Sequence, residues 1–170
     1  MRRELGGPCR IQVERKDIEV DRPDRRHVHD RHELLVFLAG AIDYRIGGTR
    51  YRLRRGDCLA IRPDEAHGYE PLGRTRYVRT TVRFDPQPLA GWAAPRPAPL
   101  AAFAGRPAGV GNRIPFNNRE THRILAWARE LVDADGPLPA MHGLLAILLL
   151  AEAAIARHGH QGERAAVGPL

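Results

Sequence analysis

The sequence predicts a mainly β domain, closed into a barrel or sandwich, that is followed by two helices. Two observations predict it. Short β-type runs separated by Gly and Pro turns fill the first half, and apolar residues recur with a helical period between residues 118 and 158. The 170 residues, 43% hydrophobic and 28% charged, suffice for one folded domain. We divide the chain into a barrel (1–86), an excursion (87–117), a two-helix dimerisation segment (118–158) and a tail (159–170).

The first half contains six runs with strand character. They cover residues 11–13, 33–38, 41–46, 49–53, 58–61 and 76–84. Gly47-Gly48 separates the third run from the fourth and predicts a hairpin, because glycine tolerates the positive φ of the primed turns. In the last run Val78, Thr80 and Val82 alternate with charged or polar residues. This period of two is typical of a sheet with two different faces.

The second half changes in composition and then in period. Residues 87–117 are rich in Pro, Ala and Gly, which predicts a linker or an irregular excursion that may return a strand to the barrel. Asn118 is the expected cap of a helix to about Asp135, which Gly136-Pro137 ends. A second helix is expected from about Pro139 to Arg157.

The second helix is apolar on every side. One stripe is expected to form a homodimer interface: Met141, Leu144, Leu145, Leu148 and Ile155. A helix of this kind must be covered all round, either by its own domain or by another subunit. We favour pairing with a second copy, because a small barrel has limited surface to cover the helix.

Several function classes are excluded by missing residues. The chain has no serine, so it has no serine triad, and Lys16, its only lysine, has no glycine-rich phosphate loop. No secretory signal opens the chain, and the longest unbroken apolar run, 144–151, is too short for a membrane span. We therefore expect a cytoplasmic protein. The net charge of +7 is compatible with location beside a DNA-binding module.

Histidines are concentrated where the strands begin. In an extended chain His27 and His29 share a face, Glu33 has the same parity, and a barrel can bring His67 back towards them. Imidazole and carboxylate groups together suit Zn, Ni, Mn or Fe. The alternative is that these histidines are exposed, or contact a ligand or water without a metal.

The same residues resemble a known motif. His27-x-His29-x3-Glu33-x6-Gly40 resembles the first motif of the cupins, whose fold is a double-stranded β-helix or jelly-roll barrel. The segment from Gly56 to His67 resembles the second motif less closely, because Arg62 and Asp64 stand where proline and glycine are usual. The resemblance implies a metal site formed by His27, His29, Glu33 and His67.

Over residues 10–158 the order of motifs is similar to the sensor domain of AraC-type transcription regulators. This resemblance implies a barrel that binds a small effector, a last helix that dimerises, and DNA contact only through a helix-turn-helix half that this chain lacks. It leaves metal occupancy open, because such sensors can keep these residues without a metal.

Two functions therefore stand beside each other. The first is an effector-sensing, dimerising domain, in which the ligand would contact the four motif residues, and Arg79 and Arg83 if it is an anion. The second is a stand-alone metal-dependent cupin enzyme, an isomerase, lyase or dioxygenase, with a three-histidine, one-glutamate site. We favour the sensor, because an apolar terminal helix suits it better than an enzyme.

Overall fold

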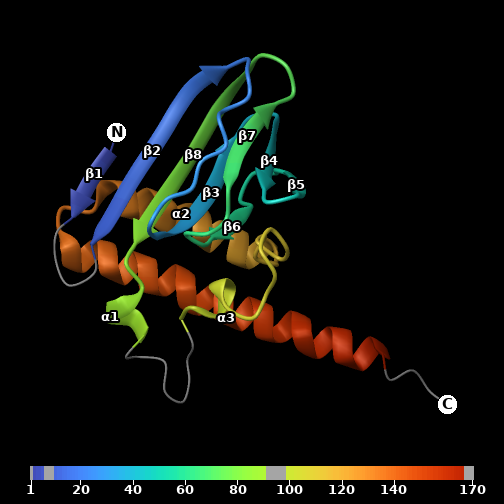
Figure 1. Ribbon diagram of the computed structural model, residues 1–170. Helices are drawn as coiled ribbons and strands as arrows, with labels where there is room; N and C mark the ends of the chain where they lie inside the picture. Colours follow the sequence, from blue (N-terminus) through green and yellow to red (C-terminus); the bar gives the residue numbers. More distant parts are fainter. Residues whose placement is uncertain (1, 6–9, 91–98, 167–170) are drawn as a thin grey trace.

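The computed structural model describes residues 2–5, 10–90 and 99–166, with eight strands in two sheets (Figure 1). The strands are β1 (Arg2–Leu5), β2 (Ile11–Val20), β3 (His32–Ala39), β4 (Ile42–Ile46), β5 (Thr49–Arg52), β6 (Cys58–Ile61), β7 (His67–Pro71) and β8 (Thr75–Phe84). A five-stranded sheet has the order β1-β2-β8-β3-β6, and a three-stranded sheet the order β5-β4-β7. Every pairing between strands is antiparallel.

Along β3 the five-stranded sheet is buried on both faces, and the alternation of its side chains explains why. On β3, Leu34 and Val36 join one hydrophobic core with the helices, whereas Leu35 and Phe37 join a second core with the small sheet. Because neighbouring residues of a strand point to opposite faces, both sets of residues can be apolar. The interior between the two sheets is the part of the fold that holds the candidate site.

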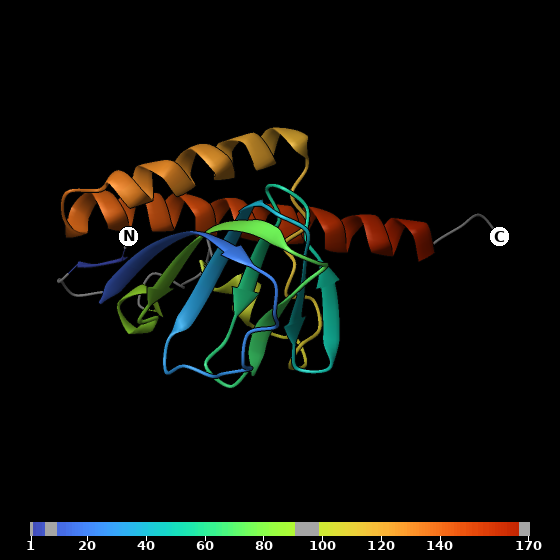
Figure 2. The same cartoon turned by 90° about the horizontal axis from the view of Figure 1, so that it is seen from above.

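Both helices cover the same face of the large sheet. Figure 2 shows α2 (Asn118–Asp133) and α3 (Pro137–Ala166) side by side on one side of the strands, with α3 projecting beyond them. Their buried side chains share the first core with β2, β3, β6 and β8. The predicted β architecture with two C-terminal helices is therefore confirmed.

The β4–β5 hairpin forms where the two glycines predict it. Ile46 pairs with Thr49, and Gly47 has a φ of 54°. Two strands were not predicted. β7 begins with His67-Gly68 and carries little apolar sequence, and β1 lies before the first predicted run. β2 is also longer than predicted, since its charged second half is exposed yet pairs along its length with β8.

The Pro/Ala/Gly-rich part of the chain includes two short helices, α1 (Gln87–Ala90) and the 3₁₀ helix η1 (Ala101–Phe103). After η1 the chain returns to the barrel. Asn112 accepts a backbone hydrogen bond from Ala60, and Ile114 donates one to Cys58. Leu59 and Arg113 form an isolated β-bridge, so this segment lies beside β6 as a strand would.

The helix boundaries differ from the predicted ones. The cap of α2 is Asn117 rather than Asn118: its side chain accepts from the backbone N–H of Glu120, and the Glu120 carboxylate accepts from the backbone N–H of Asn117. This reciprocal capping box selects the start of the helix. α3 begins at Pro137 and continues to Ala166, so most of the predicted tail is helical.

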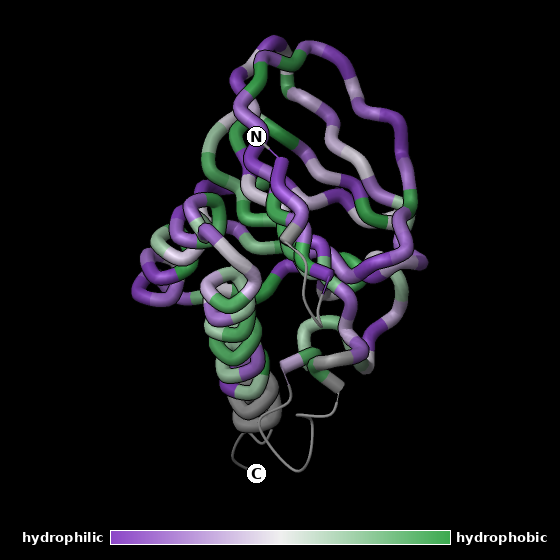
Figure 3. Tube along the Cα trace, turned by 90° about the vertical axis from the view of Figure 1, so that its left-hand side faces the viewer, coloured by the Kyte–Doolittle hydropathy of each residue, from purple (hydrophilic) through white to green (hydrophobic). Residues whose placement is uncertain are grey.

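The expectation that no segment could cross a membrane needs correction. Within Pro137–His158, an 18-residue window has a mean hydropathy of 1.9, so this stretch is long and apolar enough for a span by length and composition. For recognising a membrane span, the longest unbroken apolar run is a poorer criterion than mean hydropathy over a window, because a helix with a few polar residues can still be strongly apolar on average. Core helices of soluble proteins pass the same test, and the buried residues of α3 belong to the core that it shares with the large sheet. Figure 3 shows that hydrophobic residues predominate along much of α3.

Candidate functional site

Backbone pairing brings the histidines together. His27, on the segment between β2 and β3, and His67, at the start of β7, exchange two backbone hydrogen bonds of 3.0 Å. Their ring centroids are 4.5 Å apart, and that of His29 lies 4.8 Å from His67. Glu33 reaches the same place from β3, where it is buried.

Three of the four predicted metal ligands converge. One potential ligand atom from each of His29, Glu33 and His67 lies within 4.8 Å of the others. His27 is outside this group: its side chain is exposed, and its Nδ1 is 3.2 Å from the carbonyl oxygen of Arg25. Its ring lies beside that of His67 but is exposed to solvent.

Glu33 is held as a carboxylate by its neighbours. Burial alone would raise its pKa, but the close contact with His29 and the positive charges of Arg83 and Arg79 outweigh burial and lower the pKa to about 2. Arg83 Nε lies 2.5 Å from Oε2, and His29 Nε2 lies 3.3 Å from the same oxygen. Glu33 therefore carries a negative charge at neutral pH.

His67 is neutral and presents one free nitrogen. Burial lowers its pKa to about 4. Its Nδ1 is 2.7 Å from the carbonyl oxygen of Glu65 and donates to it, which leaves Nε2 as the unprotonated atom. Within the described part of the chain this buried Nε2 has no hydrogen-bond partner, and neither ring nitrogen of His29 makes a well-aligned hydrogen bond there.

An imidazole that donates through one nitrogen to a carbonyl and presents the other is the usual arrangement of a histidine metal ligand. The donor set of two imidazoles and one carboxylate fits a divalent transition metal. The same atoms equally fit a polar group of an organic ligand, since each unpartnered nitrogen can accept or donate a hydrogen bond. Arg83 occupies one side of the Glu33 carboxylate and competes with a metal for it.

The predicted anion-binding arginines also face the interior, from β8. Arg83 lies opposite Glu33 in the β3–β8 register, and Arg79 lies opposite Phe37. Arg79 is 6% exposed, and its guanidinium lies over the Tyr77 ring at 5.8 Å from the centroid. Tyr44, whose ring stacks on His67 with centroids 6.1 Å apart, closes the interior from β4; burial raises its pKa well above the ordinary value.

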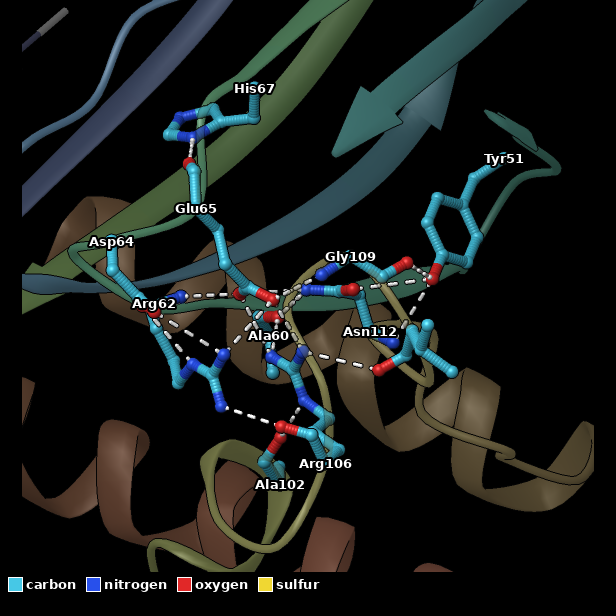
Figure 4. A network of polar contacts seen from close by, with 11 residues as sticks. Tyr51, Ala60, Arg62, Asp64, Glu65, His67, Ala102, Arg106, Gly109 and Asn112 are labelled. Carbon is cyan, nitrogen blue, oxygen red and sulfur yellow. Dashed lines mark hydrogen bonds and ion pairs between the residues drawn. The ribbon is translucent and has the colours of Figure 1, made fainter. Parts of the chain in front are cut away.

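A second buried polar cluster lies directly behind His67, and the sequence analysis missed it (Figure 4). Glu65 is 1% exposed and accepts hydrogen bonds from Arg106, from the side chain of Asn112, and from the backbone N–H groups of Arg62 and Gly109. Burial would raise its pKa, but these bonds outweigh it and lower the pKa to about 2. No spacing rule links residues so far apart in the chain.

The Glu65 cluster attaches the 99–116 segment to the barrel. Tyr51 on β5 donates to the carbonyl oxygen of Gly109 at 2.8 Å, and Asn112 donates to that of Ala60. Gly109 has a φ of 76°, and a Cβ there would lie 2.5 Å from the carbonyl oxygen of Ile46. Only glycine allows this close approach.

The residues of the predicted dimer stripe divide into two groups. Leu144 and Leu148 are 0% exposed in the single chain, so they belong to its own core and are not available to a partner. Three members remain partly accessible: Met141, Leu145 and Ile155. Leu149, which the predicted stripe did not include, is 39% exposed.

Comparisons with known proteins found a matching family and similar solved structures. The family described as "AraC-like ligand binding domain" matches residues 18–163. Among solved structures, a mutant form of Bacillus subtilis oxalate decarboxylase OxdC is similar with a TM-score of 0.40 and 14% identity, over 48% of this chain and 22% of that chain. The search of curated proteins found no match.

Two further structures show likenesses of similar extent. YhaK from Escherichia coli has a TM-score of 0.39 and 17% identity, over 48% of this chain and 38% of its own. The plu4264 protein from Photorhabdus luminescens has a TM-score of 0.42 and 18% identity, over 48% of this chain and 68% of its own. The chain thus corresponds to about a fifth of the oxalate decarboxylase and to larger parts of the other two.

Proposed function

Because the chain belongs to the family of AraC-like ligand binding domains, we propose that it is the effector-sensing and dimerising part of an AraC-type transcription regulator. The effector is a small molecule held between the two sheets. In this proposal DNA is contacted by a helix-turn-helix unit outside these 170 residues, and the protein acts in the cytoplasm.

One observation carries the proposal. His67 Nε2 is buried and unpartnered among the described residues, and it faces His29 and the charged carboxylate of Glu33. A buried polar atom without a partner costs about 1–3 kcal/mol, so such atoms usually mark a site that another molecule completes. A bound effector would satisfy them.

A screen of small molecules by thermal unfolding tests the barrel site. A ligand that binds the folded chain raises Tm as its concentration rises. From these shifts we expect the apparent affinity of His67→Gln for the ligand to be at least tenfold lower than that of the parent. His122→Gln is the matched control, because His122 is exposed on α2. Ligands that stabilise the parent and His67→Gln equally would place effector binding elsewhere.

Binding in the barrel has a direct route to the helices. The Nδ1 of His67 donates to Glu65, whose side chain holds Arg106 and Gly109 of the 99–116 segment. In the same segment, Phe103 of η1 packs into the core that α3 shares. An effector that prefers one position of His67 would bias this connection, by its different affinity for the two states.

Dimerisation is proposed through the accessible side of α3. Leu149 and Leu150 line a shallow hollow of about 410 Å³ together with Trp127 of α2. Leu149→Glu should shift the chain from dimer to monomer in sedimentation. Leu72→Glu is the control, since Leu72 is equally exposed but lies on the β7–β8 turn, away from the helices. A Leu149→Glu chain that still sediments as a dimer would contradict this interface.

The regulator assignment has its own test. The gene beyond codon 170 should encode a helix-turn-helix pair, and the full-length product should bind DNA with an affinity that the effector changes. A reading frame that continues without such a unit would contradict the assignment, although the barrel site would stand.

A metal-dependent cupin enzyme is the second candidate, favoured by the convergence of His29, Glu33 and His67. A divalent ion held by these residues would act as a Lewis acid on oxygen atoms of a bound molecule. Elemental analysis after growth with Zn, Ni, Mn or Fe tests it. A metal content equal to that of His67→Ala would exclude the enzyme in this form, whereas a stoichiometric ion lost in His67→Ala would favour it.

A further inference from the structure

The inner face of β8 carries a row of polar groups, and only one of them contacts the histidine cluster. Arg83, Thr81, Arg79 and Tyr77 alternate along the strand and face the interior between the sheets. Arg83 forms a hydrogen-bonded ion pair with Glu33. Arg79 and Tyr77 lie further along the strand, beside the apolar part of the interior, and each has an atom without a partner among the described residues.

Arg79 is buried, and one edge of its guanidinium makes no hydrogen bond with the described residues. Its Nη1 donates to Thr81 Oγ1 at 3.0 Å. For Nε the described residues supply no hydrogen-bond partner, and Nη2 is 3.8 Å from the Glu14 carboxylate, beyond hydrogen-bond distance. Nε and Nη2 form the edge on which a carboxylate binds arginine with two parallel hydrogen bonds.

Tyr77 adds a second unpartnered donor at the neighbouring inward position of β8. Its side chain is 0% exposed, and nothing in the described chain accepts or donates a hydrogen bond at its hydroxyl. The guanidinium of Arg79 lies 5.8 Å from the centre of its ring. Unpartnered buried donors are rare in folded proteins, and two of them on neighbouring inward positions of one strand indicate a shared acceptor.

The carboxylates near Arg79 also contact other positively charged or imidazole groups. Glu33 is in contact with Arg83 and His29. Glu14 is also 4.0 Å from Lys16 Nζ, and its side chain is 21% exposed, so solvent screens it. Arg79 is therefore a buried cation whose nearest acids are shared with other cations, and such a cation favours an anion that enters the interior.

The surroundings define the rest of the ligand. Phe37 lies opposite Arg79 on β3, and the Tyr69 ring is 4.8 Å from that of Tyr77. Both belong to the core of the barrel interior or pack against it. We propose that the molecule bound in this barrel is an apolar carboxylate, whose carboxylate accepts hydrogen bonds from Arg79 and Tyr77 while its apolar body lies against Phe37 and Tyr69.

This inference rests on the proposed function, since it assumes that a small molecule enters the barrel. The test compares carboxylates with amides of the same shape: butyrate with butyramide, benzoate with benzamide, and phenylacetate with phenylacetamide. Each is titrated into the full chain at constant ionic strength, and Tm and heat of binding are recorded. We expect at least one acid to raise Tm and its amide to raise it far less, with an affinity at least tenfold lower.

Two variants assign the effect to these residues. Tyr77→Phe removes only the hydroxyl, and we expect about tenfold weaker carboxylate binding with an unliganded Tm that is unchanged or higher, because an unpartnered buried hydroxyl is lost. Arg79→Met should abolish the preference for the acid. Arg74→Met is the matched control, since Arg74 is exposed on the turn before the same strand.

The outcomes distinguish the carboxylate inference from the proposed effector site in the barrel. Equal binding of acid and amide, or acid binding that Tyr77→Phe and Arg79→Met leave unchanged, would overturn the carboxylate inference and leave the effector site intact. Failure of every acid and every amide to bind the parent chain would overturn the inference, and it would also count against a ligand site in the barrel.

Discussion

Glu65 and Arg106 lie 41 residues apart in the chain and form a buried ion pair, with Nη1 2.6 Å from Oε1 and Nη2 3.0 Å from Oε2. Glu65 comes from the turn before β7, and Arg106 from the segment after η1. The pair thus joins the wall of the candidate site to the part of the chain that leads to the helices.

Removing one partner of this pair should destabilise the fold strongly. Glu65→Gln leaves the Arg106 guanidinium, whose side chain is only 11% exposed, without its counter-charge, which should cost at most about 3–5 kcal/mol. Chemical denaturation of the variant and the parent measures the difference in the free energy of unfolding. The double variant Glu65→Gln/Arg106→Met should recover part of the loss, and a single variant as stable as the parent would show that the cluster does not hold the 99–116 segment.

Glu120 joins α2 to α3, and its contribution should depend on pH. Its carboxylate completes the capping box and accepts two hydrogen bonds of 2.8 Å from Arg157. Burial raises its pKa, but the bonds from Arg157 and Asn117 outweigh it, so the folded pKa lies below the ordinary 4.5. Glu120→Gln should cost about 1–2 kcal/mol at neutral pH.

Since the pKa of Glu120 is lowered on folding, its stabilising effect is complete above pH about 4.5 and is lost as pH falls through the lowered value. The difference between the parent and Glu120→Gln should therefore shrink in acid. Glu130→Gln is the control on the exposed side of the same helix. A difference that stays constant from neutral to acidic pH would contradict the role of the charge.

Cys58 should be chemically inert in the folded chain. It is 0% exposed on β6, and burial raises its pKa to about 12, so the reactive thiolate is scarce at neutral pH. In a Cys9→Ala background, a thiol reagent such as iodoacetamide should label the chain only after denaturation. Labelling of the native chain at the rate of the unfolded chain would show that β6 is not packed against the helices.

The neighbours Leu148 and Leu149 should lose very different amounts of stability on truncation to alanine. Leu148→Ala removes a fully buried side chain and should cost about 2–5 kcal/mol, whereas Leu149→Ala should cost less than about 1 kcal/mol. Thermal unfolding at a protein concentration that keeps the chain monomeric measures both. Equal losses would mean that α3 is rotated about its axis relative to the packing described.

Period and turn chemistry were sufficient to predict most of the fold. Three local signals were enough: the alternation in β8, the double glycine between β4 and β5, and the helical period after residue 118. The strand, the hairpin and the helices form at the positions that these signals predict. The boundaries that were wrong depend on contacts. Asn117 rather than Asn118 caps α2 because of Glu120, and β7 exists because its backbone pairs with β4.

The candidate site was predicted in part. Parity and motif spacing placed His29, Glu33 and His67 in one interior, and the structure brings them together. His27 has the same parity, but its side chain is exposed. It lies on an exposed segment outside the regular strands, where alternation does not determine the direction of a side chain. The choice between Leu148 and Leu149 as the accessible residue could not be read from a helix that is apolar on every side.

The sequence by itself thus determined which residues could face the barrel interior, because the alternation of a strand is a property of the backbone. Only the tertiary structure decided which polar atoms meet there and which remain without partners. The ion pair between Glu65 and Arg106 depends on the packing of segments that are distant in the chain, and so does the edge of Arg79 that makes no hydrogen bond. Local periodicity carries no information about such contacts.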